Sequence, residues 1–311
     1  MAAGKTSRLT IILAKRHVMK KPRTGRRLVR TWPLLAPSIG VLLLWAFVPL
    51  IMTLWFSFQR YNLMVPSISG FAGINNYRFL IENPAFFISI LNELILVGSV
   101  LVITITLGIA FAVLFDQDFF GRDIARLLVI APFFVMPTVA ALIWKNLLMD
   151  PVNGVFAYLA RCLGFAPIDW FSTCPMLGII IIVAWNWLPF ATLILLTALQ
   201  SLDTQQLEAA RMDGARGPQV LRYIILPHLA RPITIVVMIE TIFLLAIFAA
   251  IFVTTSGGPG TATTTLTYLI YQRALVDFNI GGASAGGVVA IILANIVAFF
   301  LVRTFARNLD L

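Results

Sequence analysis

The chain has 311 residues, of which 60% are apolar and only 12% are charged, and its formal net charge is +10 at pH 7. The mean hydropathy of +0.94 excludes a soluble domain, because a chain of this length cannot hide that much apolar surface in its own core. Open strands leave backbone groups unpaired in hydrocarbon. We therefore predict an all-α polytopic membrane protein.

Residues 1–31 form the first predicted region, a basic cytoplasmic tail. It holds ten Lys and Arg, from Lys5 to Arg30. The apolar run Leu9–Ala14 is too short for the core of a signal peptide and is followed by charges, so no cleaved signal is expected. The net charge is explained by membrane topology rather than by nucleic-acid binding. Contact of the tail with anionic lipid head groups is an alternative to a solvated tail.

Residues 32–311 form the second predicted region, a transmembrane domain. Six of its segments are apolar and long enough to cross a bilayer as helices, which takes about 20 residues each. Pro137 and Pro189 are expected to kink two of these helices. The predicted spans are Leu34–Phe56, Ile88–Phe115, Leu127–Leu147, Met176–Leu199, Pro232–Val253 and Ala285–Val302.

The orientation of these spans follows from the distribution of Lys and Arg. With six crossings, the tail and the connections on its side hold eighteen of these residues, against five on the opposite side. Basic residues accumulate on the cytoplasmic side of membrane proteins. Both termini and the polar segment 203–231 are therefore predicted to be cytoplasmic.

Cys162 and Cys174 both follow the third span, on the predicted outer side. A disulfide is chemically possible in an oxidising compartment, and two free thiols are the favoured alternative. No metal site is predicted, because His17 and His228 are far apart and have no Cys at ligand spacing.

The fourth span carries a polar and aromatic group that suits a hydroxylated solute. Trp185 and Trp187 offer indole faces to the C–H faces of a sugar or polyol, and Asn186 offers both a donor and an acceptor to its hydroxyls. The three residues are candidates for the solute pathway. Core packing or a place in an interfacial aromatic belt explains the Trp residues equally well.

Two carboxylates lie within predicted spans. Glu240 is in the middle of the fifth, where a charge costs about 2.5–3.5 kcal/mol, so it must face protein or a water-filled cavity. It either accepts a hydrogen bond from a solute hydroxyl in the pathway or makes a structural bond between helices. Glu93 lies near the outer start of the second span, and we expect it to be closer to water.

The segment 208–227 reads EAARMDGARGPQVLRYIILP and interrupts the apolar pattern. It predicts two short helices that meet at Gly214, the second beginning at Gly217-Pro218. Glu208 is expected in the first turn of the first helix, where the helix dipole favours a carboxylate. The two helices would form a compact knob that fits a groove on another protein. An interfacial amphipathic loop without a partner is the alternative.

This spacing resembles the EAA loop of binding-protein-dependent ABC importer permeases, which reads Glu-Ala-Ala, three residues, Gly, nine residues and Ile-x-Leu-Pro. From about Trp32 to Leu311 the chain resembles the carbohydrate-uptake branch of these permeases, and most of all the polyol (mannitol/sorbitol) importers. Ala131–Asn146, Trp185–Asp203 and Gly281–Gly287 carry the polyol resemblance, whereas Glu93 departs from the Asn-Thr expected there. The loop positions that match are Glu208, Ala209, Ala210, Asp213, Gly214, Ala215, Ile224, Leu226 and Pro227.

The resemblance implies a type I ABC importer permease fold with six transmembrane helices in a bacterial inner membrane. It also implies a second permease subunit, two ATPase subunits and a periplasmic or lipid-anchored solute-binding protein as partners, in addition to membrane lipids. ATP and Mg would be bound by the ATPase, and this chain would need no cofactor of its own.

The sequence also excludes several activities. It holds no G-x-x-x-x-G-K-[ST] motif and no recognisable catalytic constellation, so we expect no enzyme activity. A self-contained secondary transporter or channel for a small polar solute is the alternative function, but it leaves the EAA spacing without an explanation.

Overall fold

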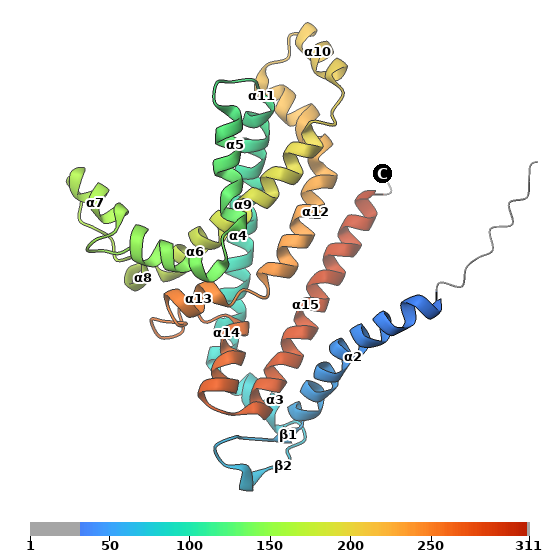
Figure 1. Ribbon diagram of the computed structural model, residues 1–311, viewed down its shortest axis with the longest axis vertical. Coiled ribbons are helices and arrows are strands. Elements are labelled where there is room, and N and C mark those ends of the chain that lie inside the picture. The colour runs from blue at the N-terminus through green and yellow to red at the C-terminus, as the bar shows by residue number, and fades with distance from the viewer. Residues whose placement is uncertain (1–31, 310–311) are drawn as a thin grey trace, which may run out of the picture. The chain divides into compact units, whose positions relative to one another are not determined.

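The computed structural model describes residues 32–309 (Figure 1). The predicted basic tail at residues 1–31 lies outside the described residues. The chain divides into two units, Met1–Leu50 and Ile51–Leu311. The described part of the first unit belongs to the apolar helix α2 (Trp32–Ser57), which continues into the second unit.

Four more helices are long and apolar enough to cross a membrane, and all four belong to the second unit. The helices that form these spans are α4 (Pro84–Asp116), α9 (Pro175–Leu199), α12 (Leu226–Leu244) and α15 (Ile280–Leu309). Pro189 lies inside α9 without ending it. Within residues 32–309 the structure therefore has five candidate spans, and a sixth if one bent pair of helices is counted.

That bent pair corrects the prediction for the third span, which is not one straight helix. α5 (Arg122–Ile130) continues into the 3-10 turn η2 (Ala131–Phe134), and after a break α6 (Pro137–Ile143) continues into the π-helical segment η3 (Trp144–Leu148). The two limbs meet at an angle of 110°. The cause is Pro137, which disfavours the helical conformation of the residue before it; Met136 accordingly has an extended ψ of 136°.

The fifth span has other bounds than predicted, because it begins earlier, at Gly217, and also ends earlier. α12 ends at Leu244 rather than at Val253, and the separate helix α13 (Ala249–Thr254) follows an irregular stretch. The chain then passes through α14 (Leu266–Tyr271) and the π-helical η5 (Gln272–Val276) before α15 begins.

The remaining elements are short. β1 (Gln59–Arg60) pairs antiparallel with β2 (Gly70–Phe71), with Gln59 opposite Phe71, so the fold is helical except for this small sheet and one isolated bridge in the described chain. Between and after these strands lie η1 (Pro66–Ile68) and α3 (Asn75–Glu82).

Two short helices, α7 (Val155–Cys162) and α8 (Trp170–Thr173), connect the third and fourth spans. Cys162 and Cys174 are both free thiols. The favoured alternative of the sequence analysis is therefore the one that the structure shows.

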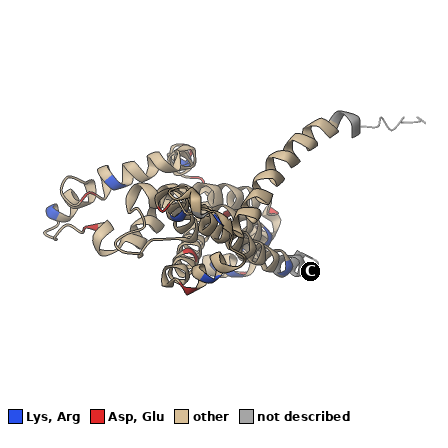
Figure 2. Ribbon diagram, turned by 90° about the horizontal axis from the view of Figure 1, so that it is seen from below, with Lys and Arg blue, Asp and Glu red and all other residues tan. Residues whose placement is uncertain are grey.

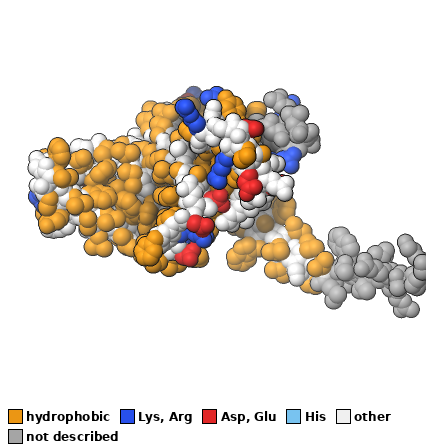
Figure 3. Space-filling model, turned by 90° about the horizontal axis from the view of Figure 1, so that it is seen from above, with side chains coloured by type: hydrophobic (Ala, Val, Ile, Leu, Met, Phe, Trp, Pro, Cys, Tyr) orange, Lys and Arg blue, Asp and Glu red, His pale blue; other side chains and the backbone are white. Residues whose placement is uncertain are grey.

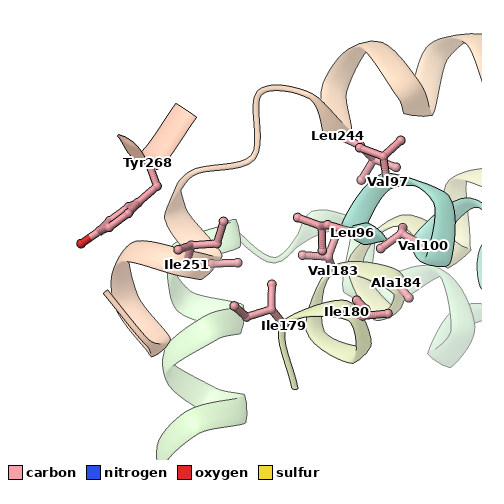
Figure 4. Close-up of a cluster of buried hydrophobic side chains, with 11 residues drawn as sticks. Leu96, Val97, Val100, Ile179, Ile180, Val183, Ala184, Leu244, Ile251 and Tyr268 are labelled. Atoms are coloured by element: carbon pink, nitrogen blue, oxygen red, sulfur yellow. The ribbon is translucent and has the colours of Figure 1, made fainter. Parts of the chain in front are cut away.

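The core of the second unit is built around α4 and α9. One apolar cluster contains Leu96 and Val100 of α4, Ile179 and Val183 of α9, and Leu244 at the end of α12 (Figure 4). Few residues of the long helices are charged (Figure 2). Interlocked apolar side chains therefore fix α4 against α9, and the positions of α12 and of the bent third span depend on further contacts with this pair.

Candidate functional site

The polar segment predicted to couple to a partner folds as a helix–turn–helix. Its first helix is α10 (Thr204–Met212), capped by Asp203, whose side chain accepts a hydrogen bond from the N–H of Gln205. Because α10 begins at Thr204, Glu208 lies in its second turn and not in the first, as we had expected. The dipole-stabilising position is occupied by Asp203 instead.

Gly214 ends α10 as predicted. Its φ of +80° is in the left-handed region, where glycine avoids the steric cost that a Cβ atom imposes. The N–H of Ala215 then donates to the carbonyl of Ala210 at 2.9 Å, which closes the end of the helix. Glu208, Ala209, Asp213 and Gly214 are exposed, whereas Ala210 and Ala215 are partly buried.

The second helix of the segment differs from the prediction in its length. α11 (Gly217–Val220) starts with Pro218 in its first turn and passes through the π-helical η4 (Leu221–Ile225) directly into α12. The segment Gly217–Leu244 is thus one continuous apolar span. Ile224, Leu226 and Pro227 lie in this rod, which connects the turn at Gly214 to α12.

This segment is exposed on one side and borders a largely apolar groove on the other. Seen from the α10 end, charged side chains of both signs gather on this face, while apolar side chains cover the flank (Figure 3). A groove of about 780 Å³ separates the segment from the end of α4, with Asp116 of α4 and Arg211 of α10 among its lining residues. The exposed side of α10 is therefore free for a contact with another protein.

A second feature is an aromatic cavity of about 380 Å³ between α9, α12, α13 and the start of α6. Both breaks in the spans border it, one before Pro137 and one at Ala246–Phe248. Irregular backbone at membrane depth is tolerated where it is buried in protein or lines a cavity, and transporters build solute sites at such breaks. The lining residues are Pro137, Val183, Asn186, Trp187, Phe243, Ala246, Ile247, Phe248, Ala249 and Ala250.

The two tryptophans of the fourth span have different surroundings. Trp187 lines the cavity and packs against Phe243 with ring centroids 5.3 Å apart. Trp185 is not among the lining residues and packs edge-to-face on Trp144 at 5.6 Å. The structure therefore brings Trp187 to the candidate solute site and places Trp185 in the packing of α9 against η3.

Asn186 lines the cavity too, but its amide nitrogen is already used. Nδ2 donates to the carbonyls of Pro132 at 3.1 Å and Val135 at 3.4 Å, which both belong to the bend of the third span. From the sequence we expect this amide to offer a donor and an acceptor to solute hydroxyls. Its two N–H groups contact backbone instead.

Glu240 has the second of its two predicted environments. Its side chain is 0% exposed, and Oε2 accepts a hydrogen bond from Oγ1 of Thr104 at 2.7 Å. Oε1 has no hydrogen-bond partner among the described residues. The carboxyl group thus links α12 to α4 and does not line the aromatic cavity, so the pathway interpretation of Glu240 is not supported by its position.

Glu93 is more deeply buried than expected, at 6% exposure. Its Oε2 accepts the N–H of Leu266 at the start of α14. The neighbouring Asn92 donates to the carbonyls of Thr261 and Thr264, at 2.9 and 3.0 Å. This pair holds the segment before α14 against α4, a role that the sequence signals only by two adjacent polar residues in an apolar span.

Most of the cavity wall could not be predicted from the sequence. Phe243 and Phe248 lie on either side of the break after α12, where helical periodicity does not predict the direction of a side chain. The predicted fifth span runs without a break over Pro232–Val253, so no sequence signal marks these two residues as cavity lining.

Comparison with known proteins identifies the family. The model of the binding-protein-dependent transport system inner membrane component matches residues 104–311. The chain belongs to this family. It is therefore a membrane-spanning permease of ABC transporters and not an enzyme.

Relatives and solved structures agree with this assignment. The permease is 39% identical over 251 residues to the probable ABC transporter permease protein y4oQ of Sinorhizobium fredii, covering 80% of this chain and 81% of that protein. It is 30% identical to the trehalose/maltose transport system permease protein MalF of Thermococcus litoralis, covering 88% and 94%.

A solved bacterial ABC transporter involved in the import of the acidic polysaccharide alginate matches with a TM-score of 0.75 at 22% identity, over 89% of this chain and 96% of that one. At this level of identity the likeness establishes the fold alone. The predicted type I importer permease fold is confirmed.

Proposed function

We propose that this permease is one subunit of an ATP-driven importer for a sugar or sugar alcohol, and that the solute passes through the cavity beside Trp187. The observation that carries the proposal is the cavity itself, which combines aromatic walls with two interrupted spans. Aromatic faces suit the C–H faces of a sugar or polyol, and interrupted spans are typical of solute sites in transporters.

The lining of the cavity favours an uncharged solute. None of its ten described lining residues is acidic or basic. A phosphorylated or acidic solute would need compensating positive charge, usually from Arg or Lys. The relatives include the sn-glycerol-3-phosphate permease UgpA of Brucella abortus, 30% identical over 267 residues, but the cavity supports a neutral sugar or polyol such as mannitol or sorbitol for this chain.

Coupling to ATP is assigned to the exposed turn at Glu208 and Gly214, which would seat in a cleft of the ATPase. α11, η4 and α12 form one rod over Gly217–Leu244, about 40 Å long at 1.5 Å per residue. The far end of this rod carries Phe243, which packs on Trp187. Closure of the ATPase around ATP and Mg would thus reach the cavity wall through a single helix.

The assembly we propose contains a second permease subunit, two ATPase subunits and a periplasmic or lipid-anchored solute-binding protein. Both termini and the α10 end would face the cytoplasm of a bacterium, and the α3 end would face outward. The free energy for uptake comes from ATP on the ATPase, so this chain contributes the pathway and the coupling contact.

Uptake of radiolabelled mannitol, sorbitol and trehalose in a strain lacking this chain tests the proposal. We expect uptake of one of these solutes to be lost, to return with the wild-type chain, and to fall at least tenfold with Trp187→Ala but less with Trp187→Phe. Co-purification of the tagged chain with a P-loop ATPase and a second permease is expected from the same cells. Unchanged uptake of all three solutes on deletion, or purification of the chain alone, would refute the proposal.

A further inference from the structure

We infer that Asn186 is a positioning residue, which fixes the bend of the third span and thereby the shape of the aromatic cavity. The inference depends on the proposed function only for the identity of the solute. The bend, the two hydrogen bonds and the lining of the cavity are features of the chain itself.

The first step concerns the two carbonyls that Asn186 contacts. In a continuous α-helix the carbonyl of Pro132 would accept from the N–H of Met136, and that of Val135 from the N–H of Val139. The bend changes both pairings. Met136 is extended, and the carbonyl of Pro132 accepts the N–H of Val135 at 3.1 Å instead. Val139 lies in the first turn of α6, so the helix that would pair its N–H with the carbonyl of Val135 is interrupted. Nδ2 of Asn186 donates to both carbonyls, at 3.1 Å to Pro132 and 3.4 Å to Val135.

The second step concerns the membrane. Backbone polar groups in the hydrocarbon region find no water, so a broken span requires donors from neighbouring helices. A carbonyl oxygen only accepts hydrogen bonds, and the amide nitrogen of Asn carries two donors. Asn186 therefore donates to both carbonyls with one side chain, in addition to the N–H of Val135 that the carbonyl of Pro132 accepts. An aspartate of the same shape would bring a carboxylate against them without any donor.

The third step is that the neighbours of Asn186 hold the two limbs of the same bend. Trp187 packs edge-to-face on Phe133 of η2, with centroids 6.4 Å apart, before the bend. Trp185 packs on Trp144 of η3, at 5.6 Å, after the bend. Three consecutive residues of α9 thus contact the first limb, the corner and the second limb.

The arrangement gives the tripeptide 185–187 a single mechanical role. Pro137, the first residue after the bend, lines the cavity together with Asn186 and Trp187. A change in the bend angle moves Pro137 relative to Trp187 and alters the width of the cavity. Asn186 therefore sets the geometry of the solute site through backbone contacts, whether or not it touches the solute.

The test uses the assembled importer and the variants Asn186→Asp and Asn186→Leu, which both lack the two N–H donors. Thr192→Val is the matched control, because Thr192 is a buried polar residue of α9 whose hydroxyl donates within its own helix, to the carbonyl of Leu188. Hydrogen exchange measured by mass spectrometry reports on the segment 131–143, and transport assays report KM and Vmax for the solute.

We expect exchange in residues 131–143 to rise at least tenfold in both Asn186 variants and to stay unchanged in the control. KM for the solute should rise about tenfold, with a smaller change in Vmax. Unchanged exchange in 131–143, or a rise spread over the whole chain, would overturn the inference. The exchange result does not require a solute, so it stands even if uptake of the tested sugars is not observed.

Discussion

Replacing Thr104 by Val removes one hydroxyl group from the contact between α4 and α12 with almost no change of shape. Oγ1 of Thr104 donates to Oε2 of Glu240 at 2.7 Å, and both side chains are fully buried. Oε1 of Glu240 has no hydrogen-bond partner among the described residues. In the Thr104→Val variant the buried carboxyl group would therefore lose its remaining side-chain donor.

The expected cost follows from this geometry. Leaving a buried polar group without its partner costs about 1–3 kcal/mol. We expect Thr104→Val to lower the free energy of unfolding by about 2 kcal/mol. The double variant Thr104→Val with Glu240→Leu should regain this loss, because replacing a whole buried polar pair by apolar residues is often neutral or stabilising.

A double-mutant cycle measures the coupling between the two residues. The two single variants, the double variant and the wild type are purified in the same mild detergent, and their thermal unfolding is compared, with Thr192→Val as the control for loss of a buried hydroxyl. Equal stability of Thr104→Val and wild type would refute the reasoning. So would a double variant that loses the sum of the two single effects, because the residues would then act independently.

Two further predictions concern glycines. Gly214→Asp should abolish uptake and weaken co-purification of the ATPase, because the φ of +80° at this position is strained for an L-residue. The amount of inserted chain should be unchanged, because the added Cβ would meet no atom within 4 Å. Normal uptake by this variant would contradict the coupling role. Gly281→Ala should lower the thermal stability of the chain, because its Cβ would lie 2.2 Å from the carbonyl oxygen of Gln59. Gly217→Ala is the control, because its Cβ has open space. An unchanged unfolding temperature of the Gly281 variant would refute this prediction.

The sequence predicts the long spans well, because about 20 apolar residues in a row have few alternatives in a membrane protein. It also locates Pro137 as a kink. The angle of 110° could not be predicted from the sequence, because a proline weakens a helix locally, while the size of the bend depends on hydrogen-bond donors elsewhere in the chain. Here the donor is Asn186, about 50 positions further along the chain.

The candidate site shows the same division between local and distant causes. Gly214 was predicted correctly because a left-handed residue at a helix end is a local requirement. Glu240 had two open interpretations, and the structural hydrogen bond that is observed depends on the position of Thr104 on another helix. Glu93 was expected to be near water but is buried. Its contact with Leu266 depends on how α14 folds back onto α4, which the local sequence does not show.

The coupling segment and the cavity are joined more directly than their separation in sequence suggests. The turn at Gly214 leads into the rod that ends at Leu244, and Phe243 near that end packs on Trp187. On the opposite wall, Asn186 and Trp187 hold the bent third span from the α9 side. α9 is fixed to α4 by an apolar core, and α12 packs on this pair through Leu229 and Val236 and through the hydrogen bond from Thr104 to Glu240. In the proposed mechanism, a force on the turn moves the wall that carries Phe243 relative to the wall that carries Trp187, and the cavity changes shape between them.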